Sequence, residues 1–334
     1  MKLKGFKGKM IIVIAMFAMI ASSAFVFTGC GGNYDFRIGI NQFLQHPSLD
    51  QTREGFVERL TELMAEEGKT VRFDNRNANG DGGTNANINR TFASRRVDLI
   101  FAIATPSAVN ARDAASPRGI PVVYGAVTAP ETHGLSGHSH VAGVSDRLDM
   151  NVQIGFIREV LGGEVTNIVF LYSSGEQNSR DQRDQMVVAA QAVGITVTPR
   201  SINVPADLNA IMTVIANSNA QAIYIGTDNQ LAANMMQVAN LNERSANSLP
   251  IITGAKSMAE DGGVASLGVD YTDVGIEAAE IAFRILIGGE TPGDIEPFYF
   301  DSDTLAILVN KSIATAINFT IPQAVIDRAY IVIE

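Results

Sequence analysis

Two strand-to-turn junctions decide the fold, and both lie between Val97 and Thr128, in VDLIFAIATPSAVNARDAASPRGIPVVYGAVT. Residues 97 to 103 are apolar or β-branched with one acidic exception, as expected for a strand buried on both faces of a parallel sheet. We expect Thr105 to be the N-cap and Pro106 the first residue of a helix of about ten residues. A second buried strand at 120 to 124 ends in small residues. In an open α/β sheet both strand ends face the binding crevice, where a helix N-terminus favours an anion.

Residues 1–29 have the pattern of a secretory signal peptide and are not expected to belong to the fold. Four lysines precede an uncharged run from 10 to 27. The sequence Phe27-Thr28-Gly29-Cys30 resembles a bacterial lipobox, in which the cysteine becomes the first mature residue and carries lipid. Cys30 is the only cysteine, so no internal disulfide is possible and acylation is its expected role. The alternative is an uncleaved membrane anchor, because 18 uncharged residues are just long enough to span a bilayer.

The charge of the remaining chain is strongly negative. Removing residues 1–29 leaves 21 of the 25 basic residues and all 35 acidic residues, a formal charge of −14, which argues against binding to nucleic acid. The remaining 305 residues are too many for one typical core and suit two lobes. We expect residues 30–35 to be a lipid-anchored spacer and the protein to be extracytoplasmic, held at the cell membrane by lipid on Cys30.

Strand, turn and helix alternate in both halves of the chain. Each half contains three strand-turn-helix units. The six units begin with RIGINQF, VDLIFAI, IPVVYGA, NIVFLYS, AQAIYIG and LPIITGA. This order predicts an α/β fold with two doubly wound parallel-sheet lobes joined by a multi-strand hinge. We expect lobe 1 to comprise 36–145 plus 271–300 and lobe 2 to comprise 146–270 plus 301–334. Further elements are expected as helices at 51–66, 274–287 and 322–329 and as strands at 70–75, 195–200 and 305–310.

The chain resembles a bacterial family, the lipoprotein substrate-binding components of ATP-binding-cassette importers related to tryptophan- and tyrosine-binding proteins. The resemblance runs from about Ile38 to Ala329 and rests on IGINQFLQHPSLDQTREGF, NANGD, VDLIFAIATPSA, AVTAP, GVSD, LYSSGEQNS, TDN and LGVDYTDVG. It implies the type I periplasmic-binding-protein (Venus-flytrap) fold, with three crossings between the lobes. It also implies a free amino acid, expected to be aromatic, that is held between closing lobes and delivered to a membrane permease. We expect no catalytic residues, no cofactor and a monomer.

A more distant likeness to branched-chain amino-acid-binding proteins implies roles for individual residues. The ligand carboxylate is held there by a serine after the third strand and by an alanine and a threonine after the fourth. These match Ser107 (or Thr105), Ala126 and Thr128. The ammonium partner matches Asp228 in TDN, although a carboxylate there is also suited to capping the next helix. Polar residues at other strand ends complete the expected ligand-binding set: Gln42, His46, Ser174, Asn178 and Asn229.

Other functions have weaker support. His133, His138 and His140 share a glycine-rich loop that we expect to be exposed, but their spacing matches no strong motif and we expect no metal site. The chain has neither a Walker loop nor a nucleophile elbow, so we do not expect an enzyme. The alternatives that stay open are a sugar- or nucleoside-binding protein of the same fold and a ligand-sensing receptor without transport. The absence of tryptophan counts against the sugar.

Overall fold

The computed structural model describes residues 34–334 of the chain. The expected signal peptide and the lipid acceptor Cys30 lie outside the described residues and stay predictions. Residues 36–334 form one compact unit with its own buried core. In this part of the chain no helix combines the length and the apolar character needed to cross a membrane.

Lobe 1 is built on a five-stranded sheet with the order β2-β1-β3-β4-β5. All four neighbouring pairs are parallel. Strands β3 and β4 are buried at every residue, as their unbroken apolar sequences predict. The bounds are β1 Phe36–Gln42, β2 Val71–Asn77, β3 Leu99–Ile103, β4 Val122–Gly125 and β5 Val141–Gly143.

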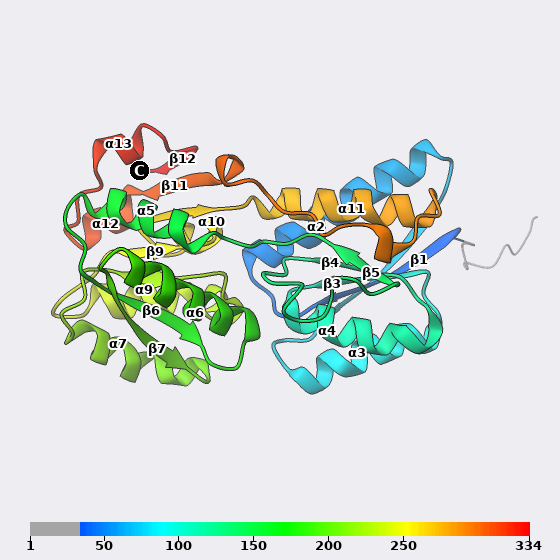
Figure 1. Ribbon diagram of the computed structural model, residues 1–334, viewed down its shortest axis with the longest axis horizontal. Helices are drawn as coiled ribbons and strands as arrows, with labels where there is room; N and C mark the ends of the chain where they lie inside the picture. The colour runs from blue at the N-terminus through cyan, green and yellow to red at the C-terminus, as the bar shows by residue number, and fades with distance from the viewer. Residues whose placement is uncertain (1–33) are drawn as a thin grey trace, which may run out of the picture. The chain divides into compact units, whose positions relative to one another are not determined.

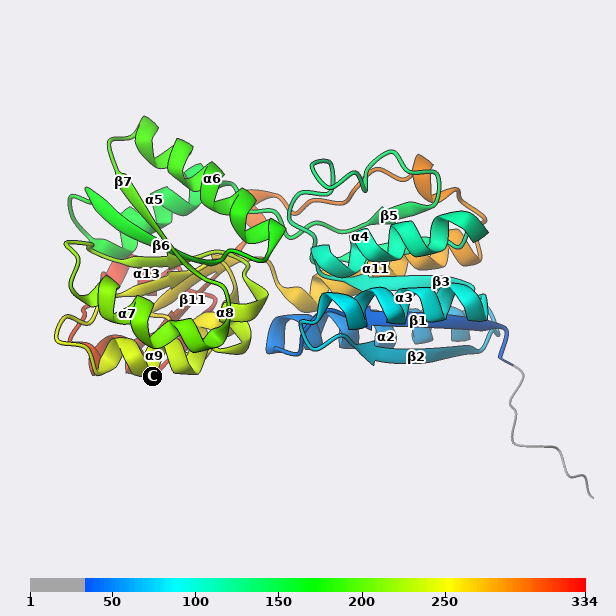
Figure 2. The same cartoon turned by 90° about the horizontal axis from the view of Figure 1, so that it is seen from below.

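Two pairs of helices cover the two faces of this sheet (Figures 1 and 2). Helices α3 (Gly82–Arg95) and α4 (Thr105–Ala115) lie on one face, and α2 (Pro47–Glu66) and α11 (Tyr271–Leu286) lie on the other. Helix α11 comes from the last quarter of the chain and returns to lobe 1.

Glycines bring α2 and α11 into close contact. A Cβ on Gly275 would lie 2.3 Å from the carbonyl oxygen of Thr52, and one on Gly55 would lie 2.5 Å from that of Thr272. Any larger residue would force the two backbones apart. The contact therefore fixes α11 to lobe 1.

Lobe 2 is built on a seven-stranded sheet with the order β12-β11-β10-β9-β8-β6-β7. All pairs are parallel except β10 and β11. Its strands are β6 Asn167–Ser173, β7 Thr196–Ile202, β8 Ile223–Ile225, β9 Ile251–Thr253, β10 Ala265–Gly268, β11 Ala306–Asn310 and β12 Ile331–Ile333. Its helices are α5 Met150–Leu161, α6 Gln177–Ala192, α7 Leu208–Ala216, α8 Asn229–Ala233, α9 Met235–Glu243, α10 Lys256–Glu260, α12 Lys311–Ala316 and α13 Gln323–Ile326.

Three segments join the two sheets. The first follows β5, the second lies between β10 and α11, and the third precedes β11. The first and third run side by side, because the N–H of Ser145 donates to the carbonyl of Phe298 at 2.9 Å and the N–H of Phe298 to that of Gly143 at 3.0 Å. The residue limits predicted for the two lobes, 36–145 plus 271–300 and 146–270 plus 301–334, stay a prediction and are used below to name the lobes.

Some local expectations are wrong. The N-cap of α4 is Ala104, with a φ of 78° and a ψ of 154°. Thr105 is the first helical residue and makes no capping bond, because the chain turns one residue earlier, at Ala104. The expected helix at 322–329 is a single short turn, α13. The loop with the three histidines is only partly exposed, since His140 is buried and the side chain of His133 is 5% exposed.

Candidate functional site

A small cavity lies between the lobes, where the carboxyl ends of strands from both sheets meet. Its volume is about 10 Å³, so an amino acid enters only if the lobes separate or the lining side chains move. The walls are His46, Ser48, Leu49, Ala126, Asp146, Asn178, Thr227, Asp228, Asn229, Ala232, Ala255, Met258 and Tyr271.

Polar contacts join the lobes directly around this cavity. They are His46 Nε2 to Asn229 Oδ1 at 3.2 Å, Ser48 Oγ to Ser257 Oγ at 2.6 Å, Thr128 Oγ1 to Thr227 Oγ1 at 3.2 Å and His133 Nε2 to Asp181 Oδ2 at 2.9 Å. The lobes are therefore closed on each other in this structure. Each of these contacts must break when the cleft opens.

Asp146, in the first crossing, is a buried carboxylate in the cavity wall. Its Oδ1 accepts the hydroxyl of Thr128 and its Oδ2 that of Tyr271, each at 2.9 Å. Burial raises the pKa of Asp146 above the ordinary value. Hydrogen bonds from Tyr271 and Thr128, and more weakly from its own N–H and the hydroxyl of Thr227, favour the charged form of Asp146.

Asp228 is a second buried carboxylate in the wall, and it caps α8. Its oxygens accept four hydrogen bonds, from the N–H of Leu231, the hydroxyl and the N–H of Ser173, and the hydroxyl of Ser179. Its acceptor positions are thus filled by the protein. The capping role weighed in the sequence analysis is present.

Glu176 lies behind Asp228 at the start of α6 and is 3% exposed. It accepts hydrogen bonds from the backbone and the side chain of Asn229 and from the N–H of Gln230. Burial, with the neighbouring Asp228 carboxylate, raises the pKa of Glu176 to about 8. We call Asp146, Glu176 and Asp228 the acidic cluster. Among the described residues that line the cavity, none is a lysine or an arginine.

Two polar atoms of the wall have no partner within residues 34–334, the Nδ1 of His46 and the Oδ1 of Asn178. Burial lowers the pKa of His46 to about 4, so its imidazole is neutral at physiological pH. A buried polar atom without a hydrogen bond is costly. Both atoms therefore fit a ligand with polar groups.

Backbone strain marks the lobe 1 side of the site. Ala104 and Ala126 both have a positive φ, of 78° and 57°, at the ends of β3 and β4. The hydroxyl of Thr105, which follows Ala104, is buried and has no partner in the described chain. Strained backbone of this kind collects at functional sites.

The structure brings half of the expected ligand residues into the cavity wall: His46, Ala126, Asn178, Asp228 and Asn229. The other expected residues do not line it. The side chain of Gln42 forms hydrogen bonds with Leu44 and Asp50, that of Ser107 with Asn85, and that of Ser174 with Asn203. The hydroxyl of Thr128 donates a hydrogen bond to Asp146. Thr105 lies at the start of α4. Contact of any of these residues with a ligand stays a prediction.

Asp146 and Tyr271 are the main wall residues that sequence reasoning missed. Both lie in motifs quoted above, GVSD and LGVDYTDVG. The feature that could have identified them is an acidic residue and an aromatic residue in the segments that cross between the lobes.

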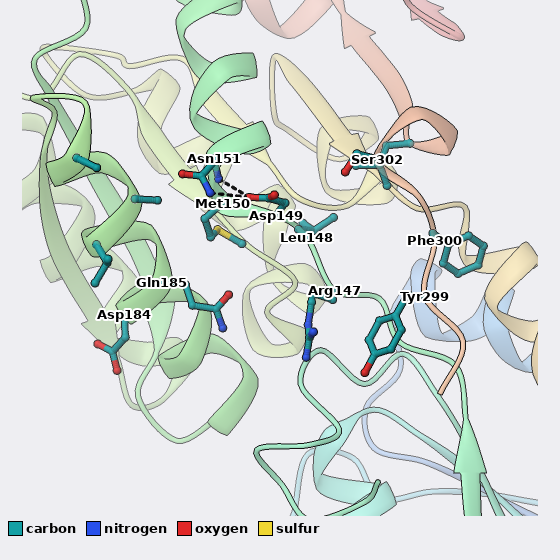
Figure 3. Close-up of a pocket in the computed structure, with 14 residues that line it drawn as sticks. Arg147, Leu148, Asp149, Met150, Asn151, Asp184, Gln185, Tyr299, Phe300 and Ser302 are labelled. Atoms are coloured by element: carbon teal, nitrogen blue, oxygen red, sulfur yellow. Dashed lines mark hydrogen bonds between the residues drawn. The ribbon is translucent and has the colours of Figure 1, made fainter. Parts of the chain in front are cut away.

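A wider groove of about 840 Å³ lies at the hinge outside the cleft (Figure 3). There Arg147 lies over the ring of Tyr299, 4.9 Å from its centroid, and the two share the carboxylate of Glu131. The Nε of Arg147 also donates to the carbonyl of Thr128 at 3.3 Å. The groove residues thus hold the segment that carries Asp146.

Comparisons with known proteins agree with this geometry. A curated tyrosine-binding protein of Clostridioides difficile (strain R20291) is 30% identical over 286 residues, which cover 84% of this chain and 80% of that protein. A structure of an ABC domain in complex with L-Trp from Streptococcus pneumonia is 31% identical, with a TM-score of 0.80 over 89% of this chain and 99% of that one.

A third relative shows the other state of the lobes. It is the ligand-free, open structure of a substrate-binding protein with adhesive properties from Clostridium difficile, 30% identical over 89% of this chain and 99% of that chain. Its TM-score is 0.66, lower than that of the L-Trp complex at nearly the same identity.

The expected fold class is confirmed by further solved structures, among them a conserved domain protein from Vibrio cholerae that is 29% identical, with a TM-score of 0.80 over 89% of this chain and 99% of that chain. A family model for ABC transporter substrate binding proteins matches residues 37–333, nearly the whole described chain. The chain belongs to the ABC transporter substrate-binding protein family.

Proposed function

We propose that the chain is the extracytoplasmic receptor of an ABC importer and binds a free amino acid with an aromatic side chain between its lobes. The acidic cluster is the observation that carries this proposal. It presents buried carboxylates to a cavity whose wall has no lysine or arginine, so the group it attracts is a cation. The ligands named for the two relatives, tyrosine and L-Trp, both carry an ammonium group.

The ammonium group is assigned to Asp146. That carboxylate accepts two strong side-chain hydrogen bonds, from Thr128 and Tyr271, whereas Asp228 accepts four hydrogen bonds from the protein. Asp228 then adds negative potential, whereas Glu176, with its pKa raised to about 8, is mostly neutral at physiological pH. In this proposal Asp146, and not Asp228 as we expected from the sequence, is the direct partner of the ammonium group.

The ligand carboxylate is assigned to the lobe 1 side, at Thr105, Ser107, Ala126 and Thr128. The N-terminus of α4 supplies unpaired N–H groups and a favourable dipole there. The unpartnered hydroxyl of Thr105 supplies a further donor.

The affinity expected from these contacts is sufficient without an arginine. A charge-assisted hydrogen bond contributes about 1.5–3 kcal/mol, and a micromolar site needs roughly 8 kcal/mol in all. Four such bonds and burial of the ligand side chain against Leu49, Met258 and Tyr271 reach that figure after the costs of association.

Native mass spectrometry of gently purified protein tests the function, followed by calorimetry with each standard amino acid. We expect a retained aromatic amino acid and micromolar or tighter binding. A retained sugar or nucleoside, with no heat from any amino acid, would overturn the proposal. A gene neighbourhood without a permease and an ATPase would favour the sensing receptor instead.

The lipid tether and the partners complete the proposal. The receptor is attached to the membrane by lipid on Cys30, works as a monomer, hands its ligand to a permease, and performs no catalysis. Labelling with a radioactive fatty acid should mark the wild type and not the Cys30→Ser chain. Unlabelled wild-type protein, processed normally, would contradict the lipoprotein assignment.

A further inference from the structure

Two neutral side chains in the cavity wall each keep one polar atom without a partner. His46 comes from lobe 1, at the N-cap of α2, and Asn178 comes from lobe 2, in the first turn of α6. Both residues are buried, with exposed fractions of 6% and 3%. Within residues 34–334, the Nδ1 of His46 and the Oδ1 of Asn178 form no hydrogen bond. Both atoms are therefore suited to a ligand that supplies the missing bond.

The unpartnered atom of Asn178 is an acceptor. The amide nitrogen of this side chain donates to the backbone carbonyl of Thr227 at 2.7 Å, and a carbonyl oxygen can only accept. This contact fixes which end of the amide is the nitrogen. The oxygen at the other end can only accept a hydrogen bond, so the group that completes it must be a donor.

The unpartnered atom of His46 is an acceptor as well. Burial lowers the pKa of His46 to about 4, so at physiological pH the imidazole is neutral and has a single N–H. Its Nε2 lies 3.2 Å from the amide oxygen of Asn229, which requires the hydrogen on that nitrogen. The other nitrogen, Nδ1, then presents a lone pair.

One carboxyl oxygen, Oε2 of Glu176, orients the amide of Asn229. It accepts the side-chain Nδ2 of Asn229 at 2.6 Å and the backbone N–H of the same residue at 3.1 Å. A proton on Oε1 of the neutral acid leaves both contacts in place. The same Oε2 also accepts the Nδ2 of Asn178 at 3.4 Å. Glu176 thus holds both side chains that lead to the unpartnered acceptors.

The apolar part of the cavity wall adjoins His46. Leu49 follows His46 by three residues at the start of α2, and both line the cavity. The hydroxyl of Ser48 lies 2.6 Å from that of Ser257, which brings α10 and its Met258 against the same turn. Leu49 and Met258 are the residues against which the proposed function places the ligand side chain. A donor on that side chain is therefore close to the unpartnered Nδ1.

We propose that His46 and Asn178 accept a hydrogen bond from the ring of the bound amino acid, so that the chain selects tyrosine and tryptophan over phenylalanine. This inference rests on the proposed function, in which an aromatic amino acid lies in the cleft. The phenol O–H and the indole N–H are donors, whereas the phenylalanine ring has none. Neutral acceptors suit these neutral donors, and the ammonium group is attracted to the carboxylate of Asp146. A site built for a hydrogen bond rejects the analogue without it, because its acceptors are then left buried and unpaired.

Matched ligands test the inference on the wild-type protein by calorimetry. Tyrosine is compared with 4-fluorophenylalanine, and tryptophan with 3-benzothienylalanine, in which sulfur replaces the indole N–H. We expect the analogues and phenylalanine to bind more than about 100-fold more weakly than the better of the two natural ligands. A loss of less than about tenfold would overturn the inference.

Two variants then remove the acceptors one at a time. His46→Phe and Asn178→Leu should each weaken binding of the better natural ligand roughly 5-fold to 150-fold. Binding of phenylalanine should stay within about threefold of the wild type, because its ring makes no use of either acceptor. The matched control is Asn209→Leu, at an exposed position on α7, which should leave all affinities unchanged. Thermal melts check that the variants fold, and each variant is informative without the other.

Equal losses for tyrosine, tryptophan and phenylalanine in these variants would place the shared ammonium group at the two acceptors and overturn the ring assignment. Tight binding of all three amino acids by the wild type would overturn the selectivity and leave the proposed function standing. No heat from any aromatic amino acid would overturn the proposed function and this inference with it. Failure of the one is thus distinguishable from failure of the other.

Discussion

The hydroxyl of Tyr271, at the start of α11, lies 2.9 Å from Oδ2 of Asp146 and donates a hydrogen bond to it. The two residues stand at different crossings between the lobes, and both line the cavity. The bond therefore connects the proposed ammonium partner to a helix that is fixed to lobe 1. We therefore expect that binding of the ligand at Asp146 is coupled to the position of lobe 1 through this hydrogen bond.

Asp146→Asn should abolish tight binding of the amino acid. Removing one partner of a buried charge pair costs about 2–5 kcal/mol, which is roughly 30-fold to several-thousand-fold in affinity. Calorimetry with the identified ligand measures the loss. The control is Asp149→Asn, three residues along, where the carboxylate caps α5 and asparagine caps equally well. Similar affinities for the two variants would remove Asp146 from the ammonium site.

Asp228→Asn should lower stability more than affinity. An amide has one oxygen to accept hydrogen bonds and an NH₂ that would face donors, so some of the four present bonds are lost. We expect a loss of about 1–3 kcal/mol in the free energy of unfolding, measured by denaturant titration without ligand. A variant that unfolds like the wild type and loses binding as Asp146→Asn does would restore Asp228 as the direct partner.

The stability of the ligand-free protein should fall as the pH rises from about 6.5 to 8. The pKa of Glu176 is about 8 in the folded protein and 4.5 ordinarily, so in this interval the folded state binds more protons than the unfolded state. His46, with its pKa lowered to about 4, acts in the opposite direction, but only below its ordinary value of 6.5. Glu176→Gln should flatten the profile between pH 6.5 and 8. An unchanged slope in that variant would assign the effect to other groups.

His133→Gln should shift the lobes toward the open form, because it removes the 2.9 Å contact between His133 Nε2 and Asp181 Oδ2 on lobe 2. We expect a larger radius of gyration without ligand by small-angle scattering. Affinity should weaken about twofold to fivefold, the range for a partly exposed pair. His138→Gln, in the same loop, is the control. Identical scattering from both variants would show that this pair does not hold the lobes together.

The sequence predicted the fold well because the fold depends on patterns that a single chain displays. Unbroken apolar strands such as β3, each followed by a helix, leave few arrangements other than two parallel sheets. Helix boundaries were less certain, since Ala104 adopts a positive φ that its side chain does not predict. Its N–H donates to the carbonyl of Gly125 at 3.0 Å, a contact that only the folded chain provides.

The site was predicted only in part, for a physical reason. Strand-end residues such as His46 and Asn229 were found because the topology places all strand ends at one edge. Asp146 was missed because its position depends on the path of the hinge, and the hydrogen bond from the Ser107 hydroxyl to Asn85 could not be foreseen from the sequence. Which polar side chains form hydrogen bonds with each other, and which are left for a ligand, depends on the tertiary structure and cannot be read from the sequence.

The glycine contact between α2 and α11 gives the protein a use as an optical sensor. Because Gly55 and Gly275 hold the two helices together, a dye on α2 reports the position of lobe 1 as a whole. Glu58 on α2 and Met236 on α9 of lobe 2 are both exposed. With Cys30→Ser no native thiol remains, so two introduced cysteines at these positions accept a fluorophore pair without competition, and energy transfer between the dyes then follows the amino-acid concentration.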